Sequence, residues 1–322
     1  MASTSGELVT VFGGSGFIGT QLVQTLARQG YRIRVAVRRP DLAGHVRMFG
    51  SVGQVVPIQA NVRNPESVTR AANGADVIVN LAGISFEAGR QRFRAVHTMG
   101  AKNVAEAARS AGARALVHMS IIGADAQSES AFLASRALGE TEVLKAVPDA
   151  TIVRPSIVFG SDDGFFNLLG GLARLLPILP VIGAKSRVQP IHVVDVAHAL
   201  AQAVAGAVRG GRAYELGGPE IETMYELSER VLAATGRRNL LLPLPVGIAR
   251  FQGSLLGLLP NPILTRDQVI RLQDDNVVSE EAKKQRRTLA AFGIAPSAMD
   301  AILPTYMWRF RKHGQFDKPV AQ

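Results

Sequence analysis

Short runs of β-branched and other apolar residues alternate with stretches of helical periodicity through the first half of the chain. We expect a strand wherever such a run lies between turn signals. The expected strands are Leu8–Phe12, Arg32–Val37, Val55–Gln59, Val77–Asn80, Leu116–Met119 and Thr151–Val153.

Helical stretches occupy the intervals between these strands, and most of them end at or near a glycine, which is a common helix stop. Strands that alternate with helices are parallel strands joined by crossover helices. The pattern therefore predicts an α/β fold with a doubly wound parallel sheet, the Rossmann architecture. The expected helices are Gly19–Gln29, Pro65–Ala72, Val96–Ala111 and Phe132–Ala146.

The pattern changes after Pro155. Residues 165–183 are rich in Leu, Gly and Pro, and a strand at Val188–Ile191 and a helix at Val194–Val208 follow them. Beyond a Gly-Gly-Pro break at 217–219, helix start signals dominate, among them capping boxes expected at Thr223 with Glu226 and at Thr265 with Gln268. We predict a dinucleotide-binding domain of residues 1–160 plus 187–218, and a smaller, mainly helical C-terminal domain of residues 161–186 plus 219–322.

Composition narrows the classes of function. The chain has 322 residues, a net charge of +10 and no cysteine, so disulfides and zinc–thiolate sites are excluded and no metal site is expected. The positive charge favours anionic ligands and surfaces, acidic lipid included, but no nucleic-acid-binding module accompanies it. The most apolar stretch is interrupted by Arg174, Pro177 and Pro180, so we expect no transmembrane helix. A first strand near Leu8 leaves no room for a signal peptide.

A glycine-rich turn links the first expected strand to the first expected helix. Gly13, Gly16 and Gly19 are spaced three apart: Gly13 permits the tight turn, Gly16 the approach of a pyrophosphate, and Gly19 the close packing of helix on sheet. The phosphates then sit at the helix N-terminus. Ser15, Phe17 and Ile18 complete the predicted cofactor loop.

The end of the second strand indicates which dinucleotide binds. An NAD site usually has an acidic residue there for the ribose 2′-hydroxyl, whereas this chain has Arg38 and Arg39. Guanidinium groups can hold a 2′-phosphate through forked, charge-assisted hydrogen bonds, so we predict NADPH (NADP) as the cofactor. The alternative is a solvated basic edge.

These motifs, with Arg154-Pro155 and the run His192–Ala197, resemble the extended or atypical short-chain dehydrogenase/reductase superfamily. The resemblance implies further cofactor contacts after the third, fourth and fifth strands, and one from the helix that follows. These are Asn61 and Val62 by the adenine, Leu81, Ala82 and Gly83 along the cofactor, Ser120 near the nicotinamide, and Arg136 on the ribose. Asn61 departs from the Asp that is usual in the superfamily.

The proton donor of the superfamily is missing. Its Tyr-x-x-x-Lys helix aligns with the segment from Ser130 to Glu140, where Phe132 takes the Tyr position and Arg136 the Lys position. A phenyl ring has no proton to donate, whereas arginine can still bind ribose oxygens. We therefore predict no catalytic residues, only the degenerate site Ser120, Phe132 and Arg136. Four other side chains are candidates to replace the tyrosine as proton donor, each of them a poor acid for that role: Ser135, Ser128, His118 and His192.

The segments 165–183 and 189–197 resemble the NADPH-binding accessory subunits of respiratory complex I and their bacterial relatives. That resemblance implies a structural cofactor, other complex I subunits as partners, and a peripheral position on the cytoplasmic side of a bacterial inner membrane. Two alternatives stay open: an NADPH-dependent reductase or epimerase with a non-standard proton donor, and an NADP(H) sensor. The Leu-rich runs 240–259 and the aromatic, basic tail could contact a partner or an anionic lipid surface.

Overall fold

The computed structural model describes residues 6–314. The chain divides into two compact units. The Rossmann unit comprises residues up to Pro155 together with Val193–Leu216 and Glu280–Ala295, and the second unit comprises Ser156–His192, Gly217–Ser279 and the described residues from Pro296 onward. The domain boundaries predicted from sequence stay a prediction; this division differs from them chiefly in grouping residues 280–295 with the Rossmann unit.

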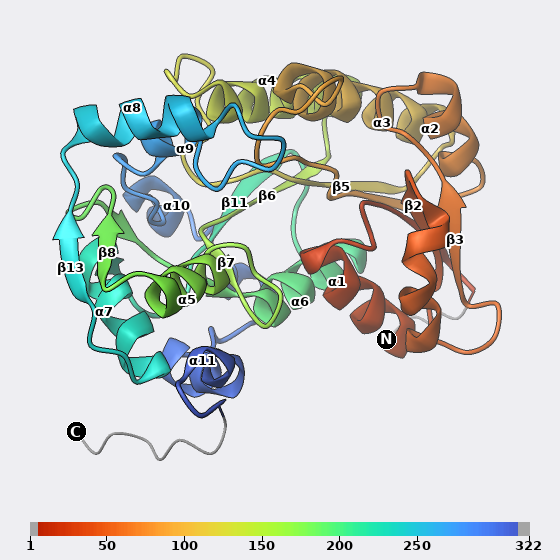
Figure 1. Cartoon of the computed structure of the whole chain (residues 1–322). Helices are drawn as coiled ribbons and strands as arrows, with labels where there is room; N and C mark the ends of the chain where they lie inside the picture. The colour runs from red at the N-terminus through yellow and green to blue at the C-terminus, as the bar shows by residue number, and fades with distance from the viewer. Residues whose placement is uncertain (1–5, 315–322) are drawn as a thin grey trace. The chain divides into compact units, whose positions relative to one another are not determined.

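The Rossmann unit contains a seven-stranded sheet in the order β11-β6-β5-β4-β1-β2-β3. Every neighbouring pair is parallel, which confirms the predicted doubly wound fold (Figure 1). The strand order reverses between β1 and β4, and in such sheets ligands bind at that switch point. The strands are β1 (Leu8–Phe12), β2 (Arg32–Val37), β3 (Val55–Gln59), β4 (Val77–Asn80), β5 (Ala115–Met119), β6 (Thr151–Pro155) and β11 (Arg212–Leu216).

Helices cover both faces of this sheet (Figure 1). On one face, α1 (Phe17–Arg28) packs against α6 (Val193–Val204), and on the other α2 (Pro65–Ala72), α3 (Met99–Ser110) and α4 (Ala131–Ala146) pack side by side. Alanines fill much of the core beneath α2 and α3, so these helices lie close to the strands. Shorter elements are the 3₁₀ helices η1 (Pro40–Phe49) and η3 (Leu289–Phe292), the π-helical turn η2 (Arg94–Thr98), and α10 (Glu280–Lys284).

The second unit combines helices with two-stranded sheets. Its core is apolar and includes Phe159, Phe166, Leu227 and Met299, all essentially inaccessible to solvent. Its helices are α5 (Phe166–Leu175), α7 (Met224–Thr235), α8 (Val246–Leu256), α9 (Arg266–Arg271), α11 (Met299–Met307) and the 3₁₀ turn η4 (Trp308–Phe310). Its strands pair as β10 (Ile191–His192) with β7 (Val158–Phe159), β12 (Glu222–Thr223) with β9 (Arg187–Val188), and β13 (Leu240–Pro243) with β8 (Ile178–Val181).

Several elements differ from their predictions: the predicted helix Val194–Val208 ends at Val204, and strand β11 was not predicted. The predicted single strand Val188–Ile191 is two strands, because the backbone pairs with different partners on either side of Pro190, which has no N–H to donate. The predicted helix Val96–Ala111 begins earlier, in the π-helical turn η2 at Arg94. Both predicted capping boxes are confirmed, with Thr223 and Thr265 as the capping residues.

No helix in the described range 6–314 is both long enough and apolar enough to cross a bilayer.

Candidate functional site

The glycine-rich turn has the geometry that a dinucleotide requires. Gly13 has φ of +81°, and a Cβ there would lie 3.1 Å from the carbonyl carbon of Leu81. A Cβ on Gly19 would lie 2.6 Å from the Cα of Gly14 and closer still to the carbonyl oxygen of Gly13, so no side chain fits. A Cβ on Gly16 would make an ordinary 3.4 Å contact. The turn therefore brings α1 against β1 and leaves its own outer surface unobstructed at Gly16.

The N-terminus of α1 is available to an anion. Gly16 occupies the N-cap position without a side-chain cap, and no acidic residue lies in the first turn of the helix. The first N–H groups of such a helix, together with its dipole, attract phosphate. Ser15 is half-buried within the turn, and Phe17 and Ile18 form the first turn of α1.

The end of β4 runs beside this turn. The Leu81 N–H donates to the carbonyl of Phe12 over 2.9 Å, which continues the β1–β4 pairing past the ends of the strands. The Ala82 N–H donates to Asn80 Oδ1 over 3.1 Å. Gly83 is exposed, so the predicted cofactor segment 81–83 borders the glycine turn at the switch point of the sheet.

Basic side chains gather where β2 and β3 end. Arg38 is exposed directly after β2. Arg39, however, forms an ion pair with Asp41 at 2.9 Å, and its Nε lies 3.2 Å from both oxygens of that carboxylate. Arg63, which no sequence motif indicated, follows β3. With the amide of Gln91 oriented to satisfy its neighbours, the Gln91 side-chain oxygen accepts from both Arg63 and Arg38. The assignment of Arg39 to the cofactor stays a prediction.

Asn61 and Val62 form the turn after β3. Asn61 Oδ1 accepts from the Arg63 N–H over 3.1 Å, and the Asn61 N–H donates to Ser67 Oγ over 2.9 Å. The carbonyl of Val62 accepts from Asn103 Nδ2 over 2.8 Å. The loop is thereby fixed to α2 and α3, and the amide of Asn61 serves this turn as an Asp would.

Ser120 is a buried hydroxyl whose partner is missing. Its side chain is 4% exposed, and its Oγ has no hydrogen-bond partner within residues 6–314. An unsatisfied buried hydroxyl is costly, and such groups are usually satisfied when a ligand or water binds. Ser120 follows β5 at the same edge of the sheet as the glycine turn, so this orphaned oxygen fits the predicted nicotinamide position.

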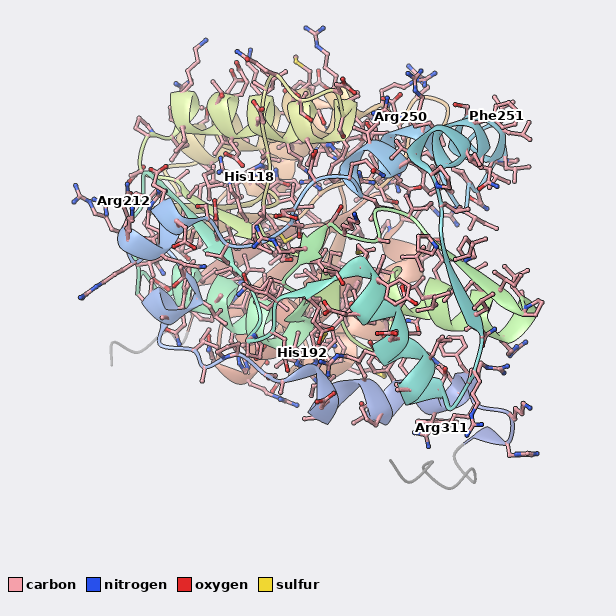
Figure 2. The ribbon with its side chains drawn as sticks, turned by 90° about the vertical axis from the view of Figure 1, so that its left-hand side faces the viewer. His118, His192, Arg212, Arg250, Phe251 and Arg311 are labelled. Carbon is pink, nitrogen blue, oxygen red and sulfur yellow. The ribbon has the colours of Figure 1, made fainter. Side chains whose placement is uncertain are left out.

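His118 lies on β5, two residues before Ser120, and is buried within the Rossmann unit (labelled in Figure 2). Burial, and secondarily the charge of Arg136, lower the pKa of His118 to about 3. Asn80 Nδ2 donates to His118 Nδ1 over 3.1 Å, which assigns the ring proton to Nε2. The imidazole is therefore neutral at physiological pH and serves poorly as a general acid.

Phe132 closes the place of the missing tyrosine. Its ring is 6% exposed and packs edge-on against Phe93 and His97, with ring centroids 5.5 and 5.1 Å away. His97 Nε2 accepts from the Ile84 N–H over 3.1 Å, and His97 Nδ1 meets Ser135 Oγ at 2.9 Å. Ser135 Oγ itself donates to the carbonyl of Phe132 over 2.8 Å. The polar groups around this ring are thus already engaged with one another.

Arg136 reaches from α4 to the ends of β4 and β5. Its Nη1 donates to the carbonyl of Met119 over 3.0 Å, and its guanidinium lies 5.3 Å from the centroid of the Phe132 ring. A Cβ on Gly83 would collide with Nη2. Arg136 therefore lies beside Gly83 and beside Met119, the residue before Ser120. This is where the resemblance to the short-chain dehydrogenase/reductases places a ribose contact.

Neither Tyr214 nor Tyr306 replaces the missing donor, because the hydroxyl of each is engaged elsewhere. The Tyr214 hydroxyl donates to the carbonyl of Arg209 over 2.8 Å. Tyr306 belongs to the second unit, where its hydroxyl donates to Asp163 over 2.9 Å. Burial and the neighbouring Asp163 charge raise the pKa of that phenol, which weakens it further as an acid.

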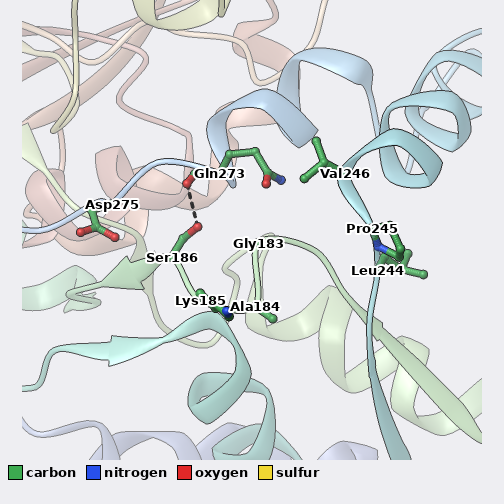
Figure 3. Close-up of a pocket in the computed structure, with 9 residues that line it drawn as sticks. All are labelled: Gly183, Ala184, Lys185, Ser186, Leu244, Pro245, Val246, Gln273 and Asp275. Carbon is green, nitrogen blue, oxygen red and sulfur yellow. Dashed lines mark hydrogen bonds between the residues drawn. The ribbon is translucent and has the colours of Figure 1, made fainter.

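The second unit contains an open pocket of about 340 Å³. Figure 3 shows Ser186 donating to the carbonyl of Gln273, a bond of 2.9 Å. Asp275 is bound by Arg187, which lowers the pKa of the carboxyl. The Ser186 hydroxyl and the Asp275 carboxylate are thus both engaged within the protein. The pocket is lined by Gly183, Ala184, Lys185, Ser186, Leu244, Pro245, Val246, Gln273 and Asp275.

Comparison with known proteins agrees with this geometry. A family model described as NAD(P)H-binding matches residues 13–164. The fold is similar to that of an Escherichia coli NADPH-dependent quinone oxidoreductase complexed with NADPH, with a TM-score of 0.72, 16% identity, and coverage of 93% of this chain and 98% of that one. The chain thus contains an NAD(P)H-binding domain with a Rossmann-like fold.

Two relatives narrow the class. The mitochondrial NADH-ubiquinone oxidoreductase 40 kDa subunit of Neurospora crassa is 33% identical over 321 residues, which are 99% of this chain and 84% of the relative. The ceramide reductase of Caulobacter vibrioides is 38% identical over 197 residues, 61% of each chain. The chain belongs to the family of the 40 kDa subunit of NADH-ubiquinone oxidoreductase.

Proposed function

We propose that this chain is a non-catalytic, NADPH-binding accessory subunit of a respiratory NADH:quinone oxidoreductase, with its cofactor held structurally. The observation that carries the proposal is the packing of Phe132 against Phe93 and His97, in the position where a reductase needs its proton donor. Membership in the 40 kDa subunit family supports the same role.

The residues of the Rossmann unit fit a bound dinucleotide. Gly13, Gly16 and Gly19 would receive the pyrophosphate at the α1 N-terminus, Ser120 Oγ would gain a partner, and Arg136 would hold the ribose. A nicotinamide cofactor supplies hydride when bound. With a phenyl ring at position 132 and a neutral, buried imidazole at 118, the surrounding side chains offer no tuned acid to deliver the accompanying proton.

Preference for NADPH over NADH follows from the charge at the adenosine end. No acidic side chain follows β2 directly, and the cations after β2 and β3 lie at one edge of the sheet. A dianionic phosphate gains far more from these guanidinium groups than a ribose hydroxyl does.

The second unit offers surface for the proposed partner subunits. Along α8, Ile248, Phe251 and Leu255 recur at helical spacing and are 51%, 71% and 61% exposed. Phe251 extends outward from the helix (Figure 2). Apolar faces of this kind mark contact sites. The peripheral position on the cytoplasmic side of a bacterial inner membrane and the contact with anionic lipid remain part of the proposal.

A reductase is the second candidate, favoured by the 38% identity to the Caulobacter ceramide reductase. The two candidates separate in one experiment on the purified full chain loaded with NADPH. We expect no oxidation of NADPH above the buffer rate when carbonyl substrates, long-chain keto-sphingolipids among them, are added. Substrate-dependent NADPH oxidation that is lost in Ser120→Ala would overturn the non-catalytic reading in favour of the reductase.

A further inference from the structure

Arg38 and Arg63 converge on a single neutral acceptor. In the amide orientation that satisfies its neighbours, the side-chain oxygen of Gln91 accepts from Arg63 Nη2 over 3.2 Å and from Arg38 Nη1 over 3.1 Å. Arg63 Nε is buried and has no hydrogen-bond partner within the described residues. The guanidinium groups of Arg38 and Arg63 thus share an acceptor that is a neutral amide oxygen and not a carboxylate.

Such an arrangement is unfavourable unless an anion completes it. Two guanidinium groups on one oxygen repel each other, and a neutral amide offsets only part of that repulsion. Arg39, by contrast, is already neutralised by the bidentate contact with Asp41, which also lowers the pKa of that carboxyl. A phosphate brought to this edge would therefore find its free charge at Arg38 and Arg63 and not at Arg39.

Topology places both arginines at the adenosine end. β2 and β3 are adjacent parallel strands, with Val37 opposite Gln59, so the residues that follow them leave the same edge of the sheet. Gln91 reaches this edge from a tight turn after β4, in which Ala88 and Gln91 exchange both backbone hydrogen bonds, at 3.0 and 2.9 Å. The turn is fixed independently of the arginines, so it presents Gln91 to them.

We propose that Arg38, Arg63 and Gln91 form the 2′-phosphate site, and that the phosphate takes the place of the Gln91 oxygen between the two guanidinium groups. The amide of Gln91 then turns its NH₂ toward the phosphate as a further donor. This inference rests on the proposed preference for NADPH and names the residues that generate it. Arg39 contributes only to the general positive field.

The test is isothermal titration of the full chain with NADPH and NADH, and with 2′,5′-ADP and 5′-AMP as probes of the adenosine end alone. We expect Arg63→Gln to weaken the binding of NADPH and of 2′,5′-ADP at least tenfold, as for loss of a charge-assisted phosphate contact. The affinities for NADH and 5′-AMP should stay within about twofold of those of the unmodified protein. Gln91→Glu places a carboxylate between the arginines. We expect it to weaken NADPH binding as strongly and to leave the affinity for NADH unchanged.

Arg39→Gln is the matched control, because it removes the same charge from the adjacent position and should change NADPH affinity less than about threefold. If Arg63→Gln weakens NADPH and NADH equally, or changes neither, this site is wrong. If the unmodified protein itself fails to distinguish NADPH from NADH, the proposed cofactor preference fails instead. Circular dichroism of each variant separates both results from loss of folding.

Discussion

Ser120 tests the cofactor site at the scale of a single residue. Its Oγ is buried without a hydrogen-bond partner in residues 6–314, so Ser120→Ala removes an unsatisfied group and should leave the free energy of unfolding unchanged or slightly raised. If the hydroxyl contacts the nicotinamide portion, the same variant should weaken NADPH binding about tenfold, the value of one lost hydrogen bond. Denaturant unfolding and nucleotide titration on one preparation measure both. A variant that unfolds more easily yet binds normally would contradict this role.

His118 should give the protein a pH-dependent stability. Its folded-state pKa of about 3 lies below the ordinary value of 6.5. The unfolded chain therefore takes up a proton before the folded chain does, and stability is fully present above pH 6.5 and falls as the pH drops toward 3. The loss is at most about 5 kcal/mol. We expect His118→Gln to flatten the urea-unfolding free energy between pH 7 and pH 4; an unchanged slope would exclude His118 as its source.

The cofactor turn and the basic site differ in how far sequence could predict them. Gly13, Gly16 and Gly19 were predictable because their roles depend on local spacing within one strand–turn–helix unit. Arg63 and Gln91 were not, because they meet Arg38 only through the pairing of β2 with β3 and a turn after β4. The pairing of Arg39 with Asp41 was predictable from the sequence, because an acidic residue two positions away is a local signal.

At the scale of the element, the contact of α1 with the glycine turn depends on a missing side chain. Gly19→Ala would press its Cβ into the backbone of Gly13 and Gly14, which cannot rotate away, and overpacking of this kind costs about 1–3 kcal/mol. Thermal unfolding should show the loss together with weaker nucleotide binding. Gly16→Ala is the control, because its Cβ makes an ordinary contact with Gly13, and its melting temperature should stay close to that of the parent protein.

Helix α4 is tied to the sheet by an ion pair. Arg154 on β6 donates to both oxygens of Glu140 on α4, over 2.9 and 2.5 Å, and the Glu140 side chain is 8% exposed. Glu140→Gln removes the nearer carboxylate and leaves Arg154 with only the longer, 3.8 Å contact to Glu215, so it should cost at most about 3 kcal/mol of unfolding free energy. Asp41→Asn breaks the solvent-exposed pair with Arg39 and should have no measurable effect. Equal effects of the two variants would contradict the structural importance of the buried pair.

Helices and strands could not be predicted correctly from the sequence where tertiary contacts determine the backbone conformation. The π-helical turn η2 places His97 against Ile84, Ser135 and Phe132, contacts between segments that no local pattern links. The strand predicted at Val188–Ile191 divided because its halves pair with different strands. The long alternating segments of the Rossmann unit were predictable, since burial on both faces of a parallel sheet determines their composition.

At the scale of the whole molecule, the apolar face of α8 should matter for assembly and little for folding. Replacing Phe251 and Leu255 with serine changes exposed side chains, so the free energy of unfolding should move by less than about 0.5 kcal/mol for each. We expect the variant to dissociate from detergent-solubilised oxidoreductase during gradient sedimentation. Met48→Ser, at a position 79% exposed in the Rossmann unit, is the control and should remain associated. Full retention of the α8 variant would remove this face from the proposed interface.

In the role proposed here, the chain holds NADPH without oxidising it. The most direct measurement is the amount and redox state of nucleotide that copurifies with the detergent-solubilised oxidoreductase, by mass spectrometry before and after sustained NADH:quinone turnover. We expect one NADPH per copy of this chain, still reduced and not replaced by labelled NADPH from the buffer. Purification of the NADPH-loaded chain apart from the oxidoreductase subunits would contradict a structural role in that complex. Conversion of the bound NADPH to NADP⁺ during turnover would contradict it as well.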